Sequence, residues 1–143
     1  MKTIEDILKR KGFNFFSVSN ETTVIEALKI MAENNIGSVV IEKNKKYCGI
    51  LTERDYARKI ILKGKKSTEQ TVEEIMSTDI PKISIETTVE DSMKLMNQNN
   101  VRYLPVFKND EMKGIISIYD LVKEIIISQE EAISQLKNYM YGN

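Results

Sequence analysis

The chain has 143 residues and a mass of 16.5 kDa, with 41% apolar, 29% charged and 7% aromatic residues, values typical of one soluble globular domain. The 21 basic and 21 acidic residues cancel, so the basic excess of a dedicated nucleic-acid or anionic-membrane binder is missing. The absence of histidine excludes Ser-His-Asp triads, Cys-His pairs and histidine-ligated metal sites.

The amino-terminal segment predicts a short capped helix over Thr3 to Lys11. It carries acidic residues where a secretory signal peptide is apolar, so we expect no signal peptide and a cytoplasmic location. The single cysteine, Cys48, cannot close an internal disulfide, which suits a reducing compartment. Because Cys48 lies within an apolar alternation, we interpret it as strand packing rather than as a reactive thiol.

Residues 17–61 predict a strand, a helix, two strands and a second helix. Thr23 precedes an apolar-periodic run and Glu26 follows three residues later, which is the capping-box pattern of a helix start. The turn-forming pair Asn34-Asn35 ends that helix. Two short apolar runs, 38–41 and 47–51, then predict a hairpin, and the second helix begins near Glu53.

A polar linker, 63–69, leads to a second copy of the same pattern. A shift of 65 positions places residues 17–61 on 82–126 without a gap, and sixteen of these forty-five positions are identical. The second copy therefore predicts a helix capped by Thr88, a hairpin over 103–117 and a helix from about Ile118. Because one copy cannot bury its apolar face alone, we expect the copies to pack about a pseudo-twofold axis and to leave a cleft between them.

The chain ends in a predicted amphipathic helix over 128–141. Ser128 and Glu131 form a capping-box pattern, and Ile133, Leu136 and Met140 form one apolar stripe. The helix before it also has a broad apolar stripe, which suits a helix shared between the core and a second copy. The apolar window 114–128 is interrupted by charges and is shorter than the ~18 to 20 residues of a membrane span.

Two matching segments carry the candidate chemistry: Gly49-Ile-Leu-Thr-Glu-Arg-Asp55 and Gly114-Ile-Ile-Ser-Ile-Tyr-Asp120. Each leads from a strand into a helix, with a hydroxyl at the N-cap and a carboxylate in the first turn. The unpaired N–H groups of such a helix start favour anions such as phosphate, and a carboxylate can accept hydrogen bonds from both hydroxyls of a ribose. The same spacing is also an ordinary capping box, so a purely structural role remains open.

The duplication and the paired Gly-h-h-Thr/Ser-x-x-Asp segments resemble two tandem cystathionine-beta-synthase (CBS) motifs, together called a Bateman module. Further strings with this resemblance are Thr52-Glu-Arg-Asp-Tyr-Ala-Arg-Lys59, Val101-Arg-Tyr-Leu-Pro-Val106 and Ser117-Ile-Tyr-Asp-Leu-Val-Lys123, as in small stand-alone prokaryotic CBS-pair proteins. The resemblance implies an α/β (α+β) fold of two tandem β-α-β-β-α motifs plus terminal helices. We divide this single module into an N-terminal helix (1–12), motif 1 (13–66), motif 2 (67–127) and a C-terminal helix (128–143).

The resemblance implies a non-catalytic regulatory module. Such modules bind AMP, ADP, ATP, NAD(H) or S-adenosylmethionine in the cleft between their motifs and signal energy or redox state to a protein partner. No cofactor or metal is expected besides this regulatory ligand, and a homodimer is expected because two such modules meet through their helices.

The resemblance also assigns roles to single residues. Asp55 and Asp120 would hold ribose, while Thr52 and Ser117 would contact phosphate. The adenine slot of the Asp120 site would comprise Phe16, Ile36, Gly37 and Ser38, and that of the Asp55 site Ile80, Pro81, Val101 and Arg102. Further expected contacts are Arg54, Arg58, Ile115 and Tyr119, where Tyr119 stands at a position that is often glycine and Tyr103 at one that is often histidine.

Three other functions stay open at this point. A ligand-independent dimerisation or interaction module is the main alternative. An enzyme would have to use the paired aspartates as acid and base, although neither a Walker loop nor a glycine-rich dinucleotide fingerprint is present. Nucleic-acid binding would have to rely on Lys63-Gly-Lys-Lys66 in the linker, which is more typical of a solvated turn.

Overall fold

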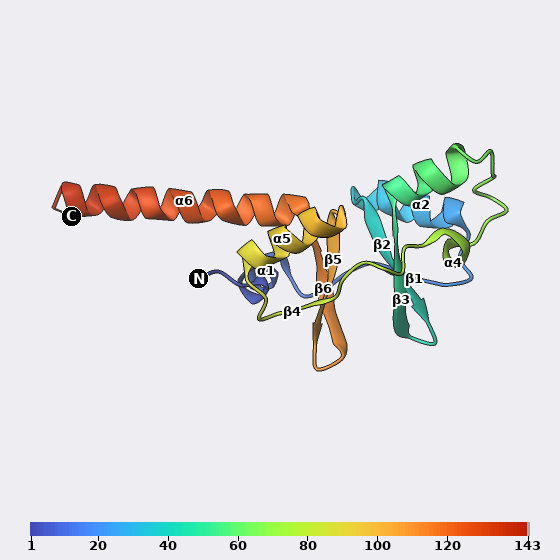
Figure 1. The fold of residues 1–143 in the computed structure, drawn as a ribbon, viewed down its shortest axis with the longest axis horizontal. Coiled ribbons are helices and arrows are strands. Elements are labelled where there is room, and N and C mark those ends of the chain that lie inside the picture. Colours follow the sequence, from blue (N-terminus) through green and yellow to red (C-terminus); the bar gives the residue numbers. More distant parts are fainter. Residues whose placement is uncertain (143) are drawn as a thin grey trace. The chain divides into compact units, whose positions relative to one another are not determined.

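The structure, a computed structural model, describes residues 1–142 as a mixed α+β fold with two three-stranded sheets (Figure 1). The chain divides into two compact units. One comprises Asn14–Ile80, and the other combines Met1–Phe13 with the segment that starts at Pro81. No helix among the described residues is both long and apolar enough to cross a membrane.

The unit over Asn14–Ile80 contains the first repeat. Its elements are β1 (Ser17–Ser19), α2 (Val24–Asn34), β2 (Ser38–Lys43), β3 (Lys46–Thr52), α3 (Glu53–Tyr56), the π-helical turn η1 (Ala57–Ile61) and α4 (Val72–Ile75). The strand order is β1-β2-β3, with β1 parallel and β3 antiparallel to β2. Its core contains residues from α2, β2, β3, η1 and α4: Val24, Ala27, Met31, Val39, Ile41, Leu51, Ile60, Val72 and Ile75.

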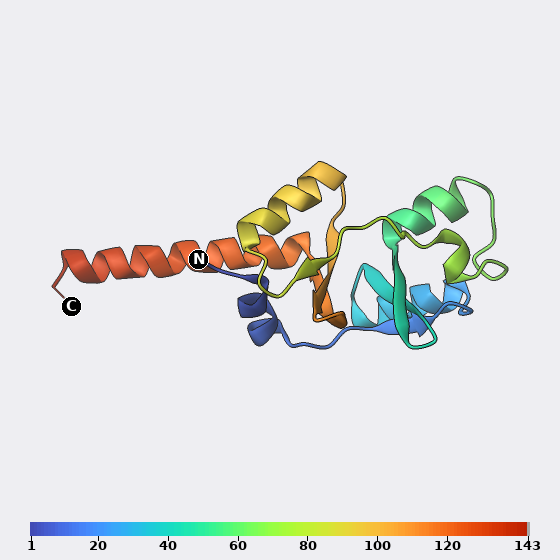
Figure 2. The same ribbon diagram turned by 60° about the horizontal axis from the view of Figure 1, so that its bottom comes forward.

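The other unit contains the second repeat. Its elements are α1 (Ile4–Lys11), β4 (Ile83–Ser84), α5 (Val89–Asn99), β5 (Tyr103–Lys108), β6 (Glu111–Ser117) and α6 (Ile118–Met140). The sheet repeats the topology of the first, with order β4-β5-β6 and the same parallel and antiparallel pairings. Figure 2 shows α5 beside the first half of α6, and the two helices are in contact.

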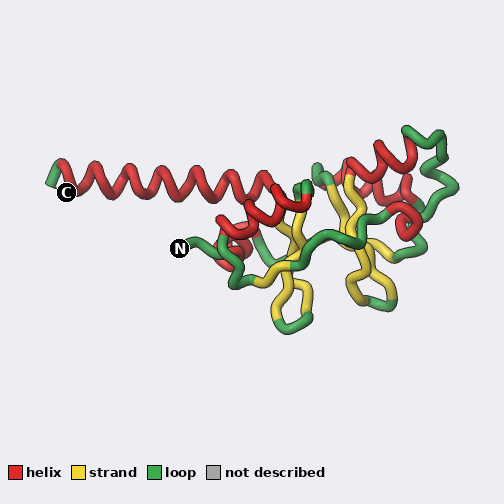
Figure 3. Tube along the Cα trace, viewed as in Figure 1, coloured by secondary structure: helices red, strands yellow, loops and turns green. Residues whose placement is uncertain are grey.

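Local sequence explains where these elements begin and end. Asn35 and Asn100 adopt the left-handed conformation at the ends of α2 and α5, which asparagine tolerates better than most residues. Both hairpins turn through two residues with positive φ, Asn44-Lys45 and Asn109-Asp110, as a type I′ turn requires. Figure 3 shows the two hairpins as paired strands joined by turns. The helix starts predicted after Thr23 and Thr88 and near Glu53 and Ile118, the asparagine turns and both hairpins are therefore confirmed.

Two predicted helices differ from those in the structure. The separate C-terminal helix is wrong, because α6 runs without a break from Ile118 to Met140 and Ser128 lies in its middle. No glycine or proline interrupts this stretch, so nothing ends the first helix. The second helix of the first repeat consists of α3 followed by the π-helical turn η1. Residue 143, at the end of the predicted C-terminal segment, lies outside the described residues.

The short segment that precedes each repeat is also duplicated, which was not predicted from the sequence. Thr3-Ile-Glu-Asp-Ile7 and Thr71-Val-Glu-Glu-Ile75 match at a shift of 68 positions, and both start a helix with a capping box. In α1, hydrogen bonds from Thr3 hold the pKa of Asp6 below its usual value. Thr3 forms an antiparallel bridge to Thr88, and Thr71 forms the corresponding bridge to Thr23.

Because of these bridges, each short helix packs on a different repeat from the one that it precedes in the sequence. Helix α1, which precedes the first repeat, packs on the second, and α4, which precedes the second repeat, packs on the first. The compact units thus differ from the sequence-based division at 1–12 and at 67–80. Burial explains the difference, because Ile4 and Val72 are fully buried against the repeats on which they pack.

The matched glycines Gly49 and Gly114 test this packing. A Cβ at Gly49 would lie 2.9 Å from the Ser77 carbonyl oxygen and 2.7 Å from Met76 Sδ, whereas a Cβ at Gly114 would meet only the Leu8 side chain, at 2.9 Å. Backbone yields less easily than a leucine rotamer, so we expect Gly49→Ala to lower the free energy of unfolding by about 1–3 kcal/mol and Gly114→Ala by less. Urea denaturation followed by circular dichroism measures both, and equal losses would contradict the prediction.

Candidate functional site

Both predicted helix starts form as expected around a hydroxyl and a carboxylate. In the first, Thr52 Oγ1 accepts a hydrogen bond from the Asp55 N–H at 3.1 Å. Asp55 Oδ2 in turn accepts from the Thr52 N–H and from Thr52 Oγ1, both at 3.0 Å. The reciprocal bonds of a capping box therefore fix the Asp55 carboxylate at the start of α3.

The second oxygen of Asp55 is also occupied. Ser77 Oγ donates to Asp55 Oδ1 at 2.8 Å, and Lys59 Nζ lies 3.0 Å from the same atom. The Asp55 residue is only 5% exposed, which fits a buried carboxylate whose acceptors all have donors. The Asp55 carboxylate thus joins the start of α3, η1 and the segment after α4 within one compact unit.

At the second helix start, the described donors contact only one of the two carboxylate oxygens of Asp120. Ser117 Oγ accepts from the Asp120 N–H at 3.1 Å, and Asp120 Oδ2 accepts from the Ser117 N–H at 2.9 Å. Lys11 Nζ, from α1, lies 2.7 Å from Oδ2 and also donates to the Ile115 carbonyl at 2.9 Å. Within residues 1–142, none of these donors reaches Asp120 Oδ1, so this oxygen can accept hydrogen bonds from a ligand.

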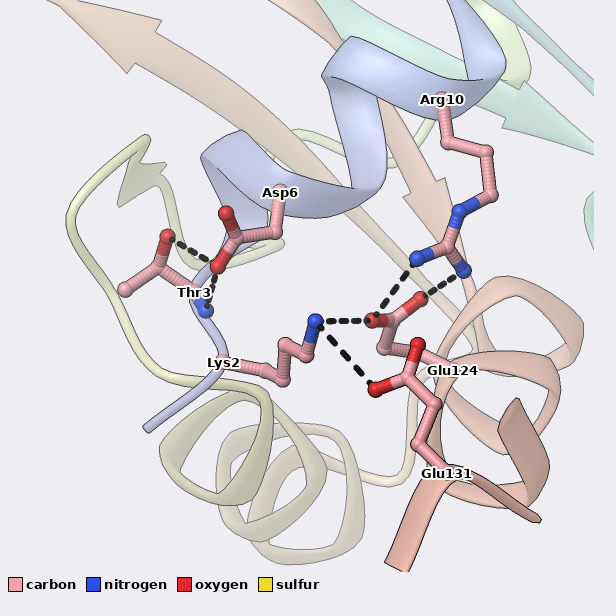
Figure 4. Close-up of polar contacts among 6 residues, drawn as sticks. All are labelled: Lys2, Thr3, Asp6, Arg10, Glu124 and Glu131. Atoms are coloured by element: carbon pink, nitrogen blue, oxygen red, sulfur yellow. Dashed lines mark hydrogen bonds and ion pairs between the residues drawn. The ribbon is translucent and has the colours of Figure 1, made fainter. Parts of the chain in front are cut away.

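A buried acid lies one turn beyond Asp120. The side chain of Glu124 is 3% exposed, and both of its oxygens bind the Arg10 guanidinium (Figure 4). Lys2 Nζ lies 4.0 Å from Glu124 and 3.9 Å from Glu131. Because a buried carboxylate is costly without partners, these cations bind the amino-terminal segment firmly to α6.

The two copies differ in charge at one matched position. Lys59 of the first copy corresponds to Glu124 of the second. Lys59 neutralises Asp55 from within its own helix, whereas Glu124 adds a second negative charge near Asp120. The compensating cations of the second copy, Arg10 and Lys11, come from α1.

Two predicted slot residues lie beside the helix start of their own repeat. The Gly37 carbonyl accepts from the Glu53 N–H at 3.1 Å, and the Arg102 carbonyl accepts from the Ile118 N–H at 2.9 Å. Val101 and Arg102 also line a pocket of about 480 Å³, together with Met93, Lys94, Met96, Asn97, Asn100 and Ile118. This volume lies in the range of small-molecule sites.

The other predicted site residues are distributed over both compact units. Ser38 and Ile80 are buried, Ile36 and Pro81 are half-buried, and Phe16 is exposed. Arg54 is half-buried and Arg58 exposed, both near the start of the helical segment that follows Thr52. Tyr119 is 69% exposed. The slot expected for Asp120 belongs entirely to the Asn14–Ile80 unit, which does not contain Asp120: Phe16, Ile36, Gly37 and Ser38. Most of the slot expected for Asp55 belongs to the other unit: Pro81, Val101 and Arg102.

The donors that hold both aspartates were not predicted from the sequence. These are Lys59 and Ser77 at Asp55, and Lys11 at Asp120. Lys59 could have been recognised from its i,i+4 spacing to Asp55 and from the charge reversal at the matched position. Ser77 and Lys11 carry no such signal, because they approach only through the packing of distant segments.

The described residues do not favour metal binding or a nucleophilic cysteine. No group of three or more His, Cys, Asp or Glu side chains within residues 1–142 could hold a metal ion. Cys48 lies in β3 and donates to the Ile41 carbonyl at 3.3 Å. Burial raises the pKa of the Cys48 thiol, which disfavours the nucleophilic thiolate.

Comparison with known proteins gives a consistent result over nearly the whole chain. The family model "CBS domain" matches residues 3–62 and 72–127. The mitochondrial CBS domain-containing protein CBSX3 of Arabidopsis thaliana is 36% identical, over 98% of this chain and 72% of its own length. YhcV of Bacillus subtilis, another CBS domain-containing protein, is 31% identical over 89% of each chain.

Solved structures show the same fold. A protein with CBS domains from Burkholderia ambifaria superposes with a TM-score of 0.86 at 37% identity, covering 90% of this chain and 96% of that one. A CBS-domain-containing protein from Agrobacterium tumefaciens superposes with a TM-score of 0.82 at 31% identity, covering 86% and 98% of the two chains.

The unequal environments of the two aspartates predict unequal costs of substitution. In Asp55→Asn, the amide NH₂ group, itself a donor, would face other donors whether it took the place of Oδ1 or of Oδ2, and Lys59 would lose its counter-ion. We therefore expect a loss of about 2–4 kcal/mol of unfolding free energy. In Asp120→Asn the amide can point to the Oδ1 side, so the loss should be about 1 kcal/mol or less. Chemical denaturation of the two variants measures this difference, and a larger loss for Asp120→Asn would contradict it.

Proposed function

Because the chain belongs to the CBS-domain family and carries the domain twice, we propose that it is a regulatory module that binds an adenine nucleotide at the Ser117–Asp120 helix start. CBS-domain proteins are generally regulatory rather than enzymatic. The ligand class comprises AMP, ADP, ATP, NAD(H) and S-adenosylmethionine, which share the adenosine group. By binding one of them, the module would report energy or redox state to a protein partner.

The observation that carries the proposal is that, within residues 1–142, the donors at this helix start reach Asp120 Oδ2 and leave Oδ1 able to accept hydrogen bonds. A ribose presents two neighbouring hydroxyl donors, and a carboxylate that has an acceptor to spare at a helix start suits them. Phosphate is favoured at the same place by the positive end of the α6 dipole and by the nearby Lys11. The 480 Å³ pocket supports the proposal through Ile118, the first residue of α6, which is among its lining residues. Val101 and Arg102, which also line this pocket, were expected in the slot of the Asp55 site instead.

The Asp55 helix start favours a different role. Its carboxylate already accepts from Thr52, Ser77 and Lys59 and is nearly inaccessible. A ligand there would have to replace strong hydrogen bonds within the protein, which reduces the net gain on binding. We therefore propose that the two sites differ in affinity and that the Asp120 site is the tighter.

Ligand-independent assembly is the second candidate function. Helix α6 exposes several large apolar side chains, among them Ile133, Leu136 and Met140. Such a surface suits an interaction module whether or not a nucleotide binds.

Isothermal titration of the full chain with AMP, ADP, ATP, NAD(H) and S-adenosylmethionine tests the main proposal. We expect saturable binding below millimolar concentration for at least one of them. Asp120→Ala should weaken binding roughly tenfold or more, because the ribose hydroxyls lose a charged acceptor. The 2′-deoxy form of the best ligand should bind unchanged protein more weakly for the same reason.

Asp91→Ala is the matched control. Asp91 occupies the same third position of α5, where its N–H binds Thr88 Oγ1, but it lies in neither predicted site. It should leave the affinity unchanged. The absence of saturable heat for every compound, or equal weakening by Asp91→Ala and Asp120→Ala, would overturn the proposal.

A further inference from the structure

One face of α6 carries an apolar pattern with the spacing of a coiled coil. Its positions alternate by three and four residues along the whole helix, and all of them are exposed. We call these seven residues the α6 seam: Tyr119, Val122, Ile126, Gln129, Ile133, Leu136 and Met140. Alternating steps of three and four define a heptad repeat, in which the seam residues occupy the a and d positions.

The seam is not the face by which α6 packs on its own unit. Leu121 is fully buried and Glu124 nearly so, and both lie on the opposite side of the first half of the helix. Beyond Ser128, every described residue of α6 is exposed, and Figure 1 shows this half extending past the strands of its unit. An isolated helix of about 12 residues is only marginally stable in water, so this half needs a partner.

We propose that the α6 seam binds the α6 seam of a second copy of this chain in an antiparallel coiled coil. The sequence is self-complementary in one register, in which Ile126 lies opposite Gln129 of the second copy. Val122 then lies opposite Ile133, and Tyr119 opposite Leu136. Twofold symmetry repeats each of these pairs, as a closed dimer interface requires.

Charge selects both the orientation and the register. Lys123 and Glu130 flank the seam at e positions, which face each other across an antiparallel pair. The proposed register places Lys123 of each copy beside Glu130 of the other, giving two attractive contacts. Sliding the helices apart by one heptad places Lys123 beside Lys137 and pairs Glu130 with itself, so like charges oppose that alternative.

An apolar groove adjoins the seam on its other flank. Its volume is about 630 Å³, and its lining includes Val89, Met93, Ile125 and Ala132. Ile125 and Ala132 are the g positions, which in the proposed register lie opposite Ala132 and Ile125 of the second copy. The second helix thereby covers apolar surface that α5 and α6 leave open, and the assembly does not depend on nucleotide binding.

Light scattering coupled to size exclusion tests the interface on the full chain at roughly micromolar concentrations and above, without and with AMP. We expect twice the chain mass of 16.5 kDa in both conditions. Leu136→Glu should yield monomers, since it places a charge in the seam, while Ser134→Glu, on the opposite exposed face, should remain dimeric. Circular dichroism checks that both variants keep their fold.

A charge exchange tests the orientation. Lys123→Glu and Glu130→Lys should each weaken the dimer roughly tenfold, because two attractive contacts become repulsive. The double variant should restore the affinity. In a parallel coil the e positions do not face each other, so the double variant would show no rescue.

Monomeric wild type, or a dimer that Leu136→Glu leaves intact, would overturn the proposed interface. A dimer without rescue in the double variant would overturn its antiparallel register. A dimer that persists when no nucleotide binds would support the interface while removing the proposed ligand function, so the two failures are distinguishable.

Discussion

The structure depends on the exchange of two short helices between the repeats. The Ile4 N–H binds the Thr87 carbonyl and the Val72 N–H binds the Thr22 carbonyl, at 2.9 and 2.8 Å. These matched bonds fasten α1 to the second repeat and α4 to the first, while their apolar side chains complete the two cores. The unit with the first repeat is one contiguous segment, Asn14–Ile80, whereas the second repeat needs α1 from the start of the chain. The folding of the second unit is therefore coupled to a distant part of the chain.

The same exchange makes the two candidate sites unequal. The first repeat neutralises Asp55 with a lysine of its own helical segment and with a serine that follows α4. The second repeat carries Glu124 where the first has Lys59, and it draws its cations from α1. Duplication thus preserved the capping geometry of both helix starts while their electrostatics diverged, which suits a division between a structural and a ligand-binding site.

Helix α6 joins the features on which the proposals depend. Its first turn carries Asp120, its second turn carries the buried Glu124, and its outer face carries the seam. The buried Glu124 is held by Arg10, and a buried carboxylate that lost this partner would be strongly destabilising. The Arg10–Glu124 contact therefore links the amino-terminal segment to the same helix that carries Asp120 and the seam.

The sequence by itself determined the duplicated β-α-β-β-α pattern, the capped starts at Thr52 and Ser117, and the asparagine turns, because these depend on residues a few positions apart. It also contained the α6 seam as a spacing, although the predicted break at Ser128 hid its length. Only the tertiary structure decided which repeat each short helix completes and which donors reach Asp55 and Asp120. Lys11 and Ser77 meet those carboxylates across 109 and 22 positions of sequence, and such contacts follow from how buried surfaces fit together rather than from local pattern.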